Sequence, residues 1–483
     1  MDEARQELRQ EPLFRTEQDP RLRLLIPLVC ACALFMESLD QTIIATSLPQ
    51  IAASLGESPL RLNLAITSYL LSLAVFIPVS GWIADRFGAR TVFCAAVAVF
   101  TASSAMCGAA NSLSMLVAMR VLQGVGGALM NPVGRLVMLK SFPRSQVVVA
   151  MGYVMMPAMI GPALGPLVGG FLTTYASWRW IFYINVPVGF LGIALALRWF
   201  DNFRETSLAR FDFPGFVLCA VGLAATQLVL EFAGRVHGSN AVEFLIISTA
   251  AFFLGAYWFY ARRTHDPVVD LTLFSLKTFR IGNVGGTLCR IGYGSTPFLL
   301  PLLLQLALGF SAFKSGLFTS LTAVSSVAMR TVTPRILRRY GFRSVLLFNG
   351  TIVAALMMCL ALITGAMPYW VLASLLLALG FFRSLMYTSL SSLGYADLAG
   401  ARISPGSSLA SVMQQLSQSF GIAISATLLG SLAGQTQYPP QSDFAAVFSI
   451  MVLFPLVAML WFVRLTPADG ALMSGHRAET EAA

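Results

Sequence analysis

The feature that most constrains this chain is a series of long apolar stretches separated by short charged loops. Because a bilayer core about 30 Å thick is crossed by roughly 20 helical residues, each such stretch predicts one transmembrane segment. Continuous apolar runs, without alternation, favour helices over membrane β-strands. We therefore expect an all-α polytopic membrane protein. Its fourteen predicted helices cover residues 24–46, 63–84, 91–110, 112–139, 146–174, 178–199, 212–233, 242–262, 280–307, 312–337, 344–366, 368–394, 406–432 and 443–465.

Composition supports this prediction. Of 483 residues, 57% are hydrophobic and only 11% are charged, which is more apolar than a soluble domain requires. We therefore expect most of the surface to face lipid. The first 20 residues mix acids and bases and contain no short apolar core, so we expect no removable signal peptide.

The positions of the basic residues predict the orientation. With an even number of helices, both termini lie on one side, and 23 of the 32 Lys and Arg fall on that side. Four fall on the opposite side and five within helices. The positive-inside rule then predicts cytoplasmic termini. The net charge of +10 thus reflects topology, and we expect no nucleic-acid partner.

A weak internal repeat predicts two related halves. Asp85-Arg-Phe-Gly-Ala-Arg90 follows the second predicted helix, and Arg338-Arg-Tyr-Gly-Phe-Arg343 follows the tenth. Duplicated six-helix bundles sharing a central cavity would explain this spacing. The predicted units are an N-terminal tail (1–23), a first bundle (24–199), an inserted helix pair (212–262), a cytoplasmic linker with a short surface helix (263–279), a second bundle (280–465) and a C-terminal tail (466–483).

Cysteine and histidine give no sign of a metal site or an enzyme. All seven cysteines fall within apolar helices, and the three histidines are far apart in loops or the tail. We expect no disulfide, no metal, no cofactor and no catalytic activity.

The first helix carries two carboxylates in apolar surroundings, Glu37 and Asp40, three residues apart. A charge at this depth costs at least about 2.5–3.5 kcal/mol, and neighbouring carboxylates disfavour each other's ionisation. Asp40 is therefore the main candidate for reversible protonation, with Glu37 as a second. The alternative is a purely structural Asp40 that is always paired with an arginine.

The segment 81–90 is a candidate gate at the cytoplasmic face. Gly81 is expected to allow close helix approach, and Asp85 can favour a helix N-terminus. Arg86 and Arg90, either side of Gly88, can pair with carboxylates or lipid phosphates. Simple membrane anchoring is the alternative, but it accounts only for the arginines.

Arg120 lies about eight residues into the fourth helix, roughly 12 Å from its outer end. This is too deep for the side chain to reach water easily, so it requires a partner. Asp40 lies at a comparable depth. We expect an ion pair between them that opens when the acid is protonated.

Glycines 161, 165 and 169 of the fifth helix share one face, which predicts close helix packing and a hinge or seal. Packing without a gating role is equally consistent with this spacing. The complete glycine and proline set is Gly161, Pro162, Gly165, Pro166, Gly169 and Gly170.

Arg290, about ten residues into the ninth helix, is the main candidate for substrate contact near the midplane. Arg135, Arg330 and Arg383 lie closer to the cytoplasmic ends of their helices, where an interfacial role is the default. If two or more point inward, the cavity would favour anionic or chelated substrates. The candidate cavity residues are Arg290, Arg135, Arg383, Gln123 and Asn131.

Several of these strings together resemble the major facilitator superfamily, in its fourteen-helix drug:proton antiporter branch, the EmrB/QacA group. They are LDQTIIATSLPQIA (39–52), GWIADRFGAR (81–90), RVLQGVGGAL (120–129), GPALGPLVGG (161–170) and WRWIFYINVPVG (178–189). Within the branch, Val133-Gly-Arg135 and the segment 290–298 resemble multidrug exporters of the MdtD type. The resemblance covers residues 24–465.

This resemblance implies a bacterial inner-membrane protein whose cofactor-free transport is driven by the proton gradient. It assigns Asp40 and Arg120 to proton coupling, Asp85, Arg86 and Arg90 to the cytoplasmic gate, and the helix-5 glycines to the antiporter motif. Two departures stand out. Arg338 occupies the position of Asp85 in the second repeat, and Glu37 is not part of the family string.

The resulting expectation is a monomeric proton-coupled exporter of small molecules. Its rival among transporters is a dedicated exporter of an organic anion or metal chelate, such as citrate or its iron complex. The sign of the cavity charge distinguishes the two. A second rival, a membrane receptor or scaffold, predicts no proton flux with any substrate.

Overall fold

The computed structural model describes residues 19, 21–205, 211–232, 240–434, 436 and 438–476. Residues 1–18 and 20 of the predicted N-terminal tail, and 477–483 of the C-terminal tail, lie outside the described residues. Helices dominate the described part, which contains no strand. The helices are α3 (Leu22–Ile43), α4 (Leu48–Leu55), α5 (Asn63–Phe76), α6 (Ser80–Phe87), α7 (Ala89–Gly108), α8 (Leu113–Ser141), α9 (Arg144–Tyr175), α10 (Trp180–Tyr183), α11 (Asn185–Trp199), α12 (Phe213–Phe232), α13 (Asn240–Ala261), α14 (Lys277–Arg280), α15 (Gly286–Gly294), α16 (Thr296–Leu302), α17 (Ala312–Ala361), α18 (Tyr369–Tyr395), α19 (Ile403–Ala433), α20 (Gln441–Met451), α21 (Leu453–Phe462) and α22 (Ala471–Ser474).

Twelve helical runs of the described residues are long and apolar enough to cross a membrane. One of them, α17, is 50 residues long and contains non-helical backbone at Gly341, so it comprises two helices joined across a kink. The run from Lys277 to Ala307 is a further helix, interrupted by π-turns at Ile281–Gly285 and Leu303–Ala307. Within the described residues, these runs correspond to the fourteen predicted helices.

The helix interruptions follow from local sequence. Pro78 lies in a 3-10 turn, Ile77–Val79, that separates α5 from α6 within the second helix. The ninth helix contains glycines at 282, 285 and 286 and prolines at 297 and 301. Glycine weakens the helical preference, and proline removes a backbone donor, so both favour such irregular turns.

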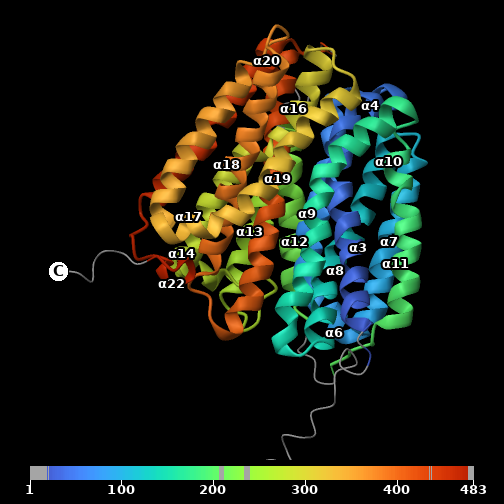
Figure 1. Cartoon of the computed structure of the whole chain (residues 1–483), viewed down its shortest axis with the longest axis vertical. Coiled ribbons are helices and arrows are strands. Elements are labelled where there is room, and N and C mark those ends of the chain that lie inside the picture. Colours follow the sequence, from blue (N-terminus) through green and yellow to red (C-terminus); the bar gives the residue numbers. More distant parts are fainter. Residues whose placement is uncertain are drawn as a thin grey trace, which may run out of the picture.

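The two halves of the chain lie side by side (Figure 1). In the N-terminal half (α3–α11), α3 packs on α9 and α7 on α8. In the C-terminal half (α14–α21), α17 packs on α18, and α15 packs between α19 and α21. Helices α12 and α13 pack on each other, and α12 also contacts α5 and α19, one from each half. The inserted pair therefore spans the junction between the bundles.

The internal repeat has a structural counterpart. Gly88 and Gly341 occupy equivalent loops and both adopt left-handed backbone, with φ of 94° and 69°. In each half, the segment following the sixth helix covers this glycine. A Cβ on Gly88 would overlap the side chain of Asn202, and one on Gly341 would lie 2.9 Å from His476 Cδ2. Only glycine meets both the backbone and the packing requirement here.

The halves are in close contact at the end where α4, α10, α16 and α20 lie, which we call the far end (Figure 1). There α9 packs on α17, and a Cβ on Gly170 would overlap the backbone of Ala312. A Cβ on Gly316 would likewise overlap the backbone of Pro166. Gln50 Nε2 donates to Gln305 Oε1 at 3.0 Å across the same junction. These contacts close the far end.

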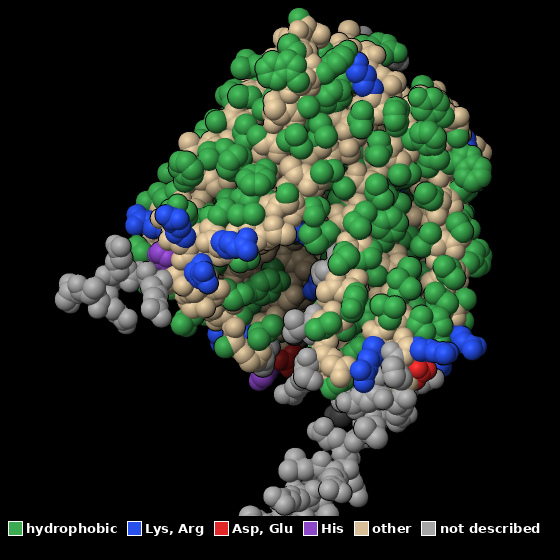
Figure 2. Space-filling view, viewed as in Figure 1, with side chains coloured by type: hydrophobic (Ala, Val, Ile, Leu, Met, Phe, Trp, Pro, Cys, Tyr) green, Lys and Arg blue, Asp and Glu red, His purple; other side chains and the backbone are tan. Residues whose placement is uncertain are grey.

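The opposite end, where α6, α14 and α22 lie, carries most of the visible Lys and Arg, and we call it the basic end (Figure 2). A hollow between the two halves opens toward it (Figure 2). The structure therefore has one closed and one open end, as expected for one state of an alternating-access cycle.

We predict that Gly170→Ala opens the far end, because the added Cβ cannot fit against Ala312. Gly152→Ala in the same helix is the matched control, since a Cβ there meets nothing within 4 Å. Spin labels at Asn111 and Thr364 would report the separation of the halves in reconstituted protein. We expect longer distances for Gly170→Ala only, and equal distances in both variants would contradict the prediction.

Candidate functional site

The centre of the N-terminal half holds a fully buried ion pair. Arg120 Nη1 lies 2.5 Å from Asp40 Oδ2, and neither side chain is exposed. Asp40 is near the end of α3 and Arg120 is eight residues into α8, so the pair joins these helices at the depth expected from the sequence. Removing two charges from water is costly unless further hydrogen bonds satisfy them.

Those further hydrogen bonds come from four helices. Asp40 Oδ1 accepts from Gln123 Nε2 at 2.8 Å and from Asn185 Nδ2 at 3.3 Å. Arg120 donates to Ala65 O at 2.9 Å and to Gln123 Oε1 at 2.8 Å. Asn185 also donates to Ser104 Oγ at 3.0 Å. The pair thereby ties helices α3, α5, α8 and α11 to one polar centre, with α7 behind it.

The aromatic ring of Tyr69 covers the arginine. Its centroid lies 4.2 Å from Arg120 Cζ, a cation–π contact, and Tyr69 is itself fully buried. Arg120 Nη2 and Tyr69 Oη are buried without a hydrogen-bond partner in the described residues. The hydrogen-bonding groups of the site are thus nearly but not completely paired. This is compatible with an arginine that changes its partner.

Glu37 has different surroundings from Asp40, although both lie on α3. Glu37 Oε1 accepts a 3.3 Å hydrogen bond from Gln41, whereas the buried Oε2 has no partner in the described part. Arg135 lies within electrostatic range but forms no ion pair with it among the described residues. The two acids share no hydrogen bond, so each is a separate candidate for protonation.

The C-terminal half contains arginines without a balancing acid. Arg290 on α15 is only 3% exposed, and its Nε has no hydrogen-bond partner in the described residues. It borders a cavity of about 40 Å³ between α15, α18 and α19. The polar residues lining this cavity are Asn283, Arg290, Ser391, Tyr395, Ser411 and Gln414.

Arg383 and Arg330 belong to the same region. Arg383 on α18 is half-buried and lies within electrostatic range of Tyr293, which favours its placement toward the cavity over an interfacial role. Arg290 and Arg330 lie within range of Tyr387. Residues 280–465 contain only two acids: Asp397, beyond the end of α18, and Asp443, in the first turn of α20. This region is therefore positively charged.

Helix α9 meets α3 through the predicted glycine face. A Cβ on Gly161 would lie 2.8 Å from Ser38 Cβ, while one on Gly165 would overlap Thr42 and one on Gly169 would overlap the carbonyl of Ile43. The expected close packing is present, and its partner is the helix that carries Asp40. Pro162 and Pro166 lie within the same continuous helix.

The 81–90 segment, which comprises the end of α6, Gly88 and the start of α7, contacts its own half. Ala89 N donates to Phe203 O, Glu205 N donates to Asp85 O, and Lys140 forms a 2.5 Å ion pair with Glu205. The Lys140 hydrogen bond holds the pKa of the exposed Glu205 carboxyl below its usual range. The segment 200–205 was not predicted as part of this site, and no signal in its sequence identified it.

One expectation for this region is wrong for the observed state. A Cβ on Gly81 would meet nothing within 4 Å, so this glycine does not serve close helix approach in the observed state. Arg86 is exposed and Arg90 half-buried, and neither forms an ion pair with a described residue, so the expected pairing with lipid phosphates stays a prediction. The segment is thus not bound to the C-terminal half here, which agrees with an open basic end.

Gln123 was predicted to line the substrate cavity, but it is fully buried between Asp40 and Arg120. The sequence could not distinguish the two faces of α8 at this point. Asn131 is half-buried with an unpartnered Oδ1, and Arg135, one turn later, is exposed. Asn185, Ser104 and Tyr69 were missed, although a polar residue such as Asn185 inside an apolar run is itself a signal.

Among the described residues, no cluster of three or more His, Cys, Asp or Glu could hold a metal ion.

We predict that Arg120→Ala destabilises the protein by about 3–5 kcal/mol, because it leaves Asp40 buried and unpaired. Adding Asp40→Asn should restore part of the loss. Arg61→Ala is the control: it breaks a partly exposed 2.6 Å pair with Glu57, and exposed pairs contribute about 0–1 kcal/mol. Unfolding in detergent measures all four proteins. Equal losses for Arg120→Ala and Arg61→Ala would refute the prediction.

Comparison with known proteins identifies the family. Residues 30–422 match the family model of the Major Facilitator Superfamily. A protein of Serratia proteamaculans named as an MdtD multidrug resistance protein is 39% identical over 446 residues, covering 91% of this chain and 93% of that relative. A protein of the same name from Pectobacterium carotovorum is 40% identical, covering 91% and 95%.

Solved structures share the fold at lower identity. An auto-inhibited peptide transporter of the POT family superposes with a TM-score of 0.68 at 16% identity, covering 93% of this chain and 98% of that one. The nucleoside transporter NupG superposes with a TM-score of 0.64 at 13% identity, covering 91% and 99%. This chain is a multi-pass membrane transporter that belongs to the major facilitator superfamily.

Proposed function

We propose that this protein is a proton-coupled exporter that moves small molecules out of the cytoplasm. The observation that carries the proposal is the dry Asp40–Arg120 pair, because a carboxylate in that position changes the balance of buried charge when it binds a proton. The names of the relatives, which refer to multidrug resistance, support the efflux direction.

The basic end is assigned to the cytoplasm by the positive-inside rule. In that orientation, the observed state has a hollow open to the cytoplasm and a closed far end (Figure 2). This is the state from which an exporter collects its substrate. Proton uptake from the opposite side must then accompany the return to this state.

Helix packing suggests how protonation of Asp40 affects the closure of the far end. Neutral Asp40 no longer holds Arg120, which loosens the contact between α3 and α8. Helix α3 lies on the glycine face of α9, and α9 continues to Gly170 at the junction with α17. A shift of α3 therefore acts on the helix that closes the far end, which provides the two-state element that coupling requires.

We predict that Asp40→Asn abolishes export driven by a pH gradient while leaving the protein folded, because Asn keeps the shape but cannot exchange a proton. Asp443→Asn, which changes an acid at the far end, is the control. Proteoliposomes with an imposed gradient and a pH dye inside measure both fluxes. Export by Asp40→Asn at the wild-type rate would overturn the coupling role.

A second candidate function, export of an organic anion or metal chelate such as citrate with or without iron, is favoured by the uncompensated arginines. Arg290, Arg330 and Arg383 share a region of the C-terminal half whose two acids lie only beyond the end of α18 and in the first turn of α20. Arg290 is buried and Arg383 half-buried, whereas Arg330 is exposed. Buried cationic groups are stabilised by an anionic ligand and disfavour a cationic one, so the argument rests mainly on Arg290.

We predict that Arg290→Gln lowers the affinity for anionic substrates by about tenfold or more, the effect of one charge-assisted hydrogen bond. Arg335→Gln removes the same charge from an exposed position at the basic end and is the control. Citrate, iron citrate and a cationic dye are compared as substrates. Selective loss of anion transport supports the anion exporter, and equal loss of all three contradicts it.

A further inference from the structure

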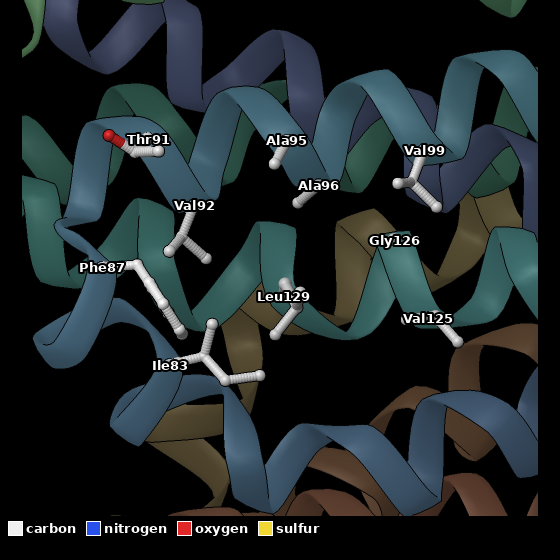
Figure 3. Close-up of a pocket in the computed structure, with 10 residues that line it drawn as sticks. All are labelled: Ile83, Phe87, Thr91, Val92, Ala95, Ala96, Val99, Val125, Gly126 and Leu129. Carbon is white, nitrogen blue, oxygen red and sulfur yellow. The ribbon is translucent and has the colours of Figure 1, made fainter.

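A groove lies on the outside of the N-terminal half, between the ends of the second and third helices and over the fourth (Figure 3). Its volume is about 250 Å³. Ile83 and Phe87 of α6 form one side and residues 91–99 of α7 the other, with Val125, Gly126 and Leu129 of α8 beneath. Apart from Thr91, every lining side chain is apolar.

The sequence explains why a groove forms here. The 3-10 turn Ile77–Val79 interrupts the second helix immediately before α6, whose Ile83 and Phe87 border the groove (Figure 3). In the middle of the α7 wall, between Val92 and Val99, the third helix presents the small side chains of Ala95 and Ala96. Small residues on α7 and α8, namely Ala95, Ala96 and Gly126, thus leave a gap that no side chain of the described residues fills.

The groove faces the lipid. Thr91 and Ala95 are exposed, and Phe87 is 52% exposed, although all three lie in or beside a membrane-spanning helix. A volume of this size is several times the roughly 30 Å³ that one water molecule takes in the liquid, but apolar walls offer water no hydrogen bonds. Left empty, the walls would forgo dispersion contacts. An acyl chain needs no hydrogen bonds and would restore the dispersion contacts.

Two arginines lie next to Phe87, which lines the groove. Arg204 Nε donates to the carbonyl oxygen of Phe87 at 3.1 Å, and the exposed Arg86 precedes Phe87 in the chain. Neither forms an ion pair with a carboxylate of the described part. Arginine at the level of the headgroups attracts anionic phosphate.

We propose that this groove binds one acyl chain of an anionic phospholipid from the leaflet at the basic end, with the lipid phosphate held by Arg86 and Arg204. The site is independent of the proposed transport function. Its wall is the end of α6, so the bound lipid lies directly beside the 81–90 segment and would move with it.

Photo-labelling of the full chain in nanodiscs tests the acyl-chain site. The probe is phosphatidylglycerol with a diazirine in the distal half of one chain, and labelled peptides are identified by mass spectrometry. We expect labels to concentrate on residues 83–99 and 125–129. Ala95→Phe, and to a lesser degree Ala95→Leu, should fill the groove and reduce this labelling several-fold.

Ala98→Phe is the matched control, because Ala98 is exposed on the same helix but does not line the groove. Both alanines face lipid, so neither substitution disturbs the core, and gel filtration verifies this. Labelling that falls equally in both variants, or that spreads evenly along the exposed face of α7, would indicate ordinary surrounding lipid and overturn the proposal.

The headgroup is tested with the same diazirine chain on phosphatidylcholine. The wild type should prefer phosphatidylglycerol, by about fivefold for each arginine that contacts the phosphate region. Arg86→Gln combined with Arg204→Gln should remove this preference but retain labelling of the groove. An unchanged preference in the double variant would contradict the assigned headgroup contacts.

Discussion

The arrangement of the helices in the N-terminal half depends on the buried ion pair between Asp40 and Arg120, whose charged atoms lie 2.5 Å apart with no access to water. Their mutual attraction is strong in a low-dielectric interior, but desolvation removes most of the gain, so the pair persists only with nearly complete hydrogen bonding. Gln123, Asn185 and the carbonyl of Ala65 supply it. Four helices must therefore keep their relative positions as long as both groups stay charged.

The position of α3 is linked to the closed far end through close backbone contacts. Glycines on α9 allow α3 to approach so closely that the two helices cannot slide independently, and α9 meets α17 in the same manner at Gly170. Where lipid surrounds the helices, the hydrophobic effect does not drive their association. Small residues instead allow close van der Waals packing between helices. A change at the Asp40–Arg120 pair can therefore alter the packing between the halves directly through α3 and α9.

The two halves share a plan but differ in charge. In each, a left-handed glycine after the second helix is covered by the segment that follows the sixth, Asn202 in one case and His476 in the other. His476 Nδ1 and the carbonyl oxygen of Arg338 are 3.1 Å apart, and Lys277 and Asp469 form a 2.6 Å pair beside them. Yet the N-terminal half balances its buried arginine with an acid, whereas the C-terminal half leaves its arginines unbalanced. The proposed division into a proton site and an anion site follows from this difference.

The sequence by itself determined the number and approximate limits of the helices, the repeat, and the partnership of Asp40 with Arg120, because helix length, charge distribution and depth follow directly from residue spacing. It could not determine the direction in which each side chain points. Gln123 belongs to the ion pair instead of the cavity, Arg383 is half-buried within electrostatic range of Tyr293, and Gly81 has no close neighbour in this state. The partners Asn185, Ser104 and Tyr69, and the segment 200–205 beneath the 81–90 segment, are brought there by helices distant in the chain. Only the tertiary structure decided these contacts, because spacing along a helix gives its faces but not which neighbour covers each one.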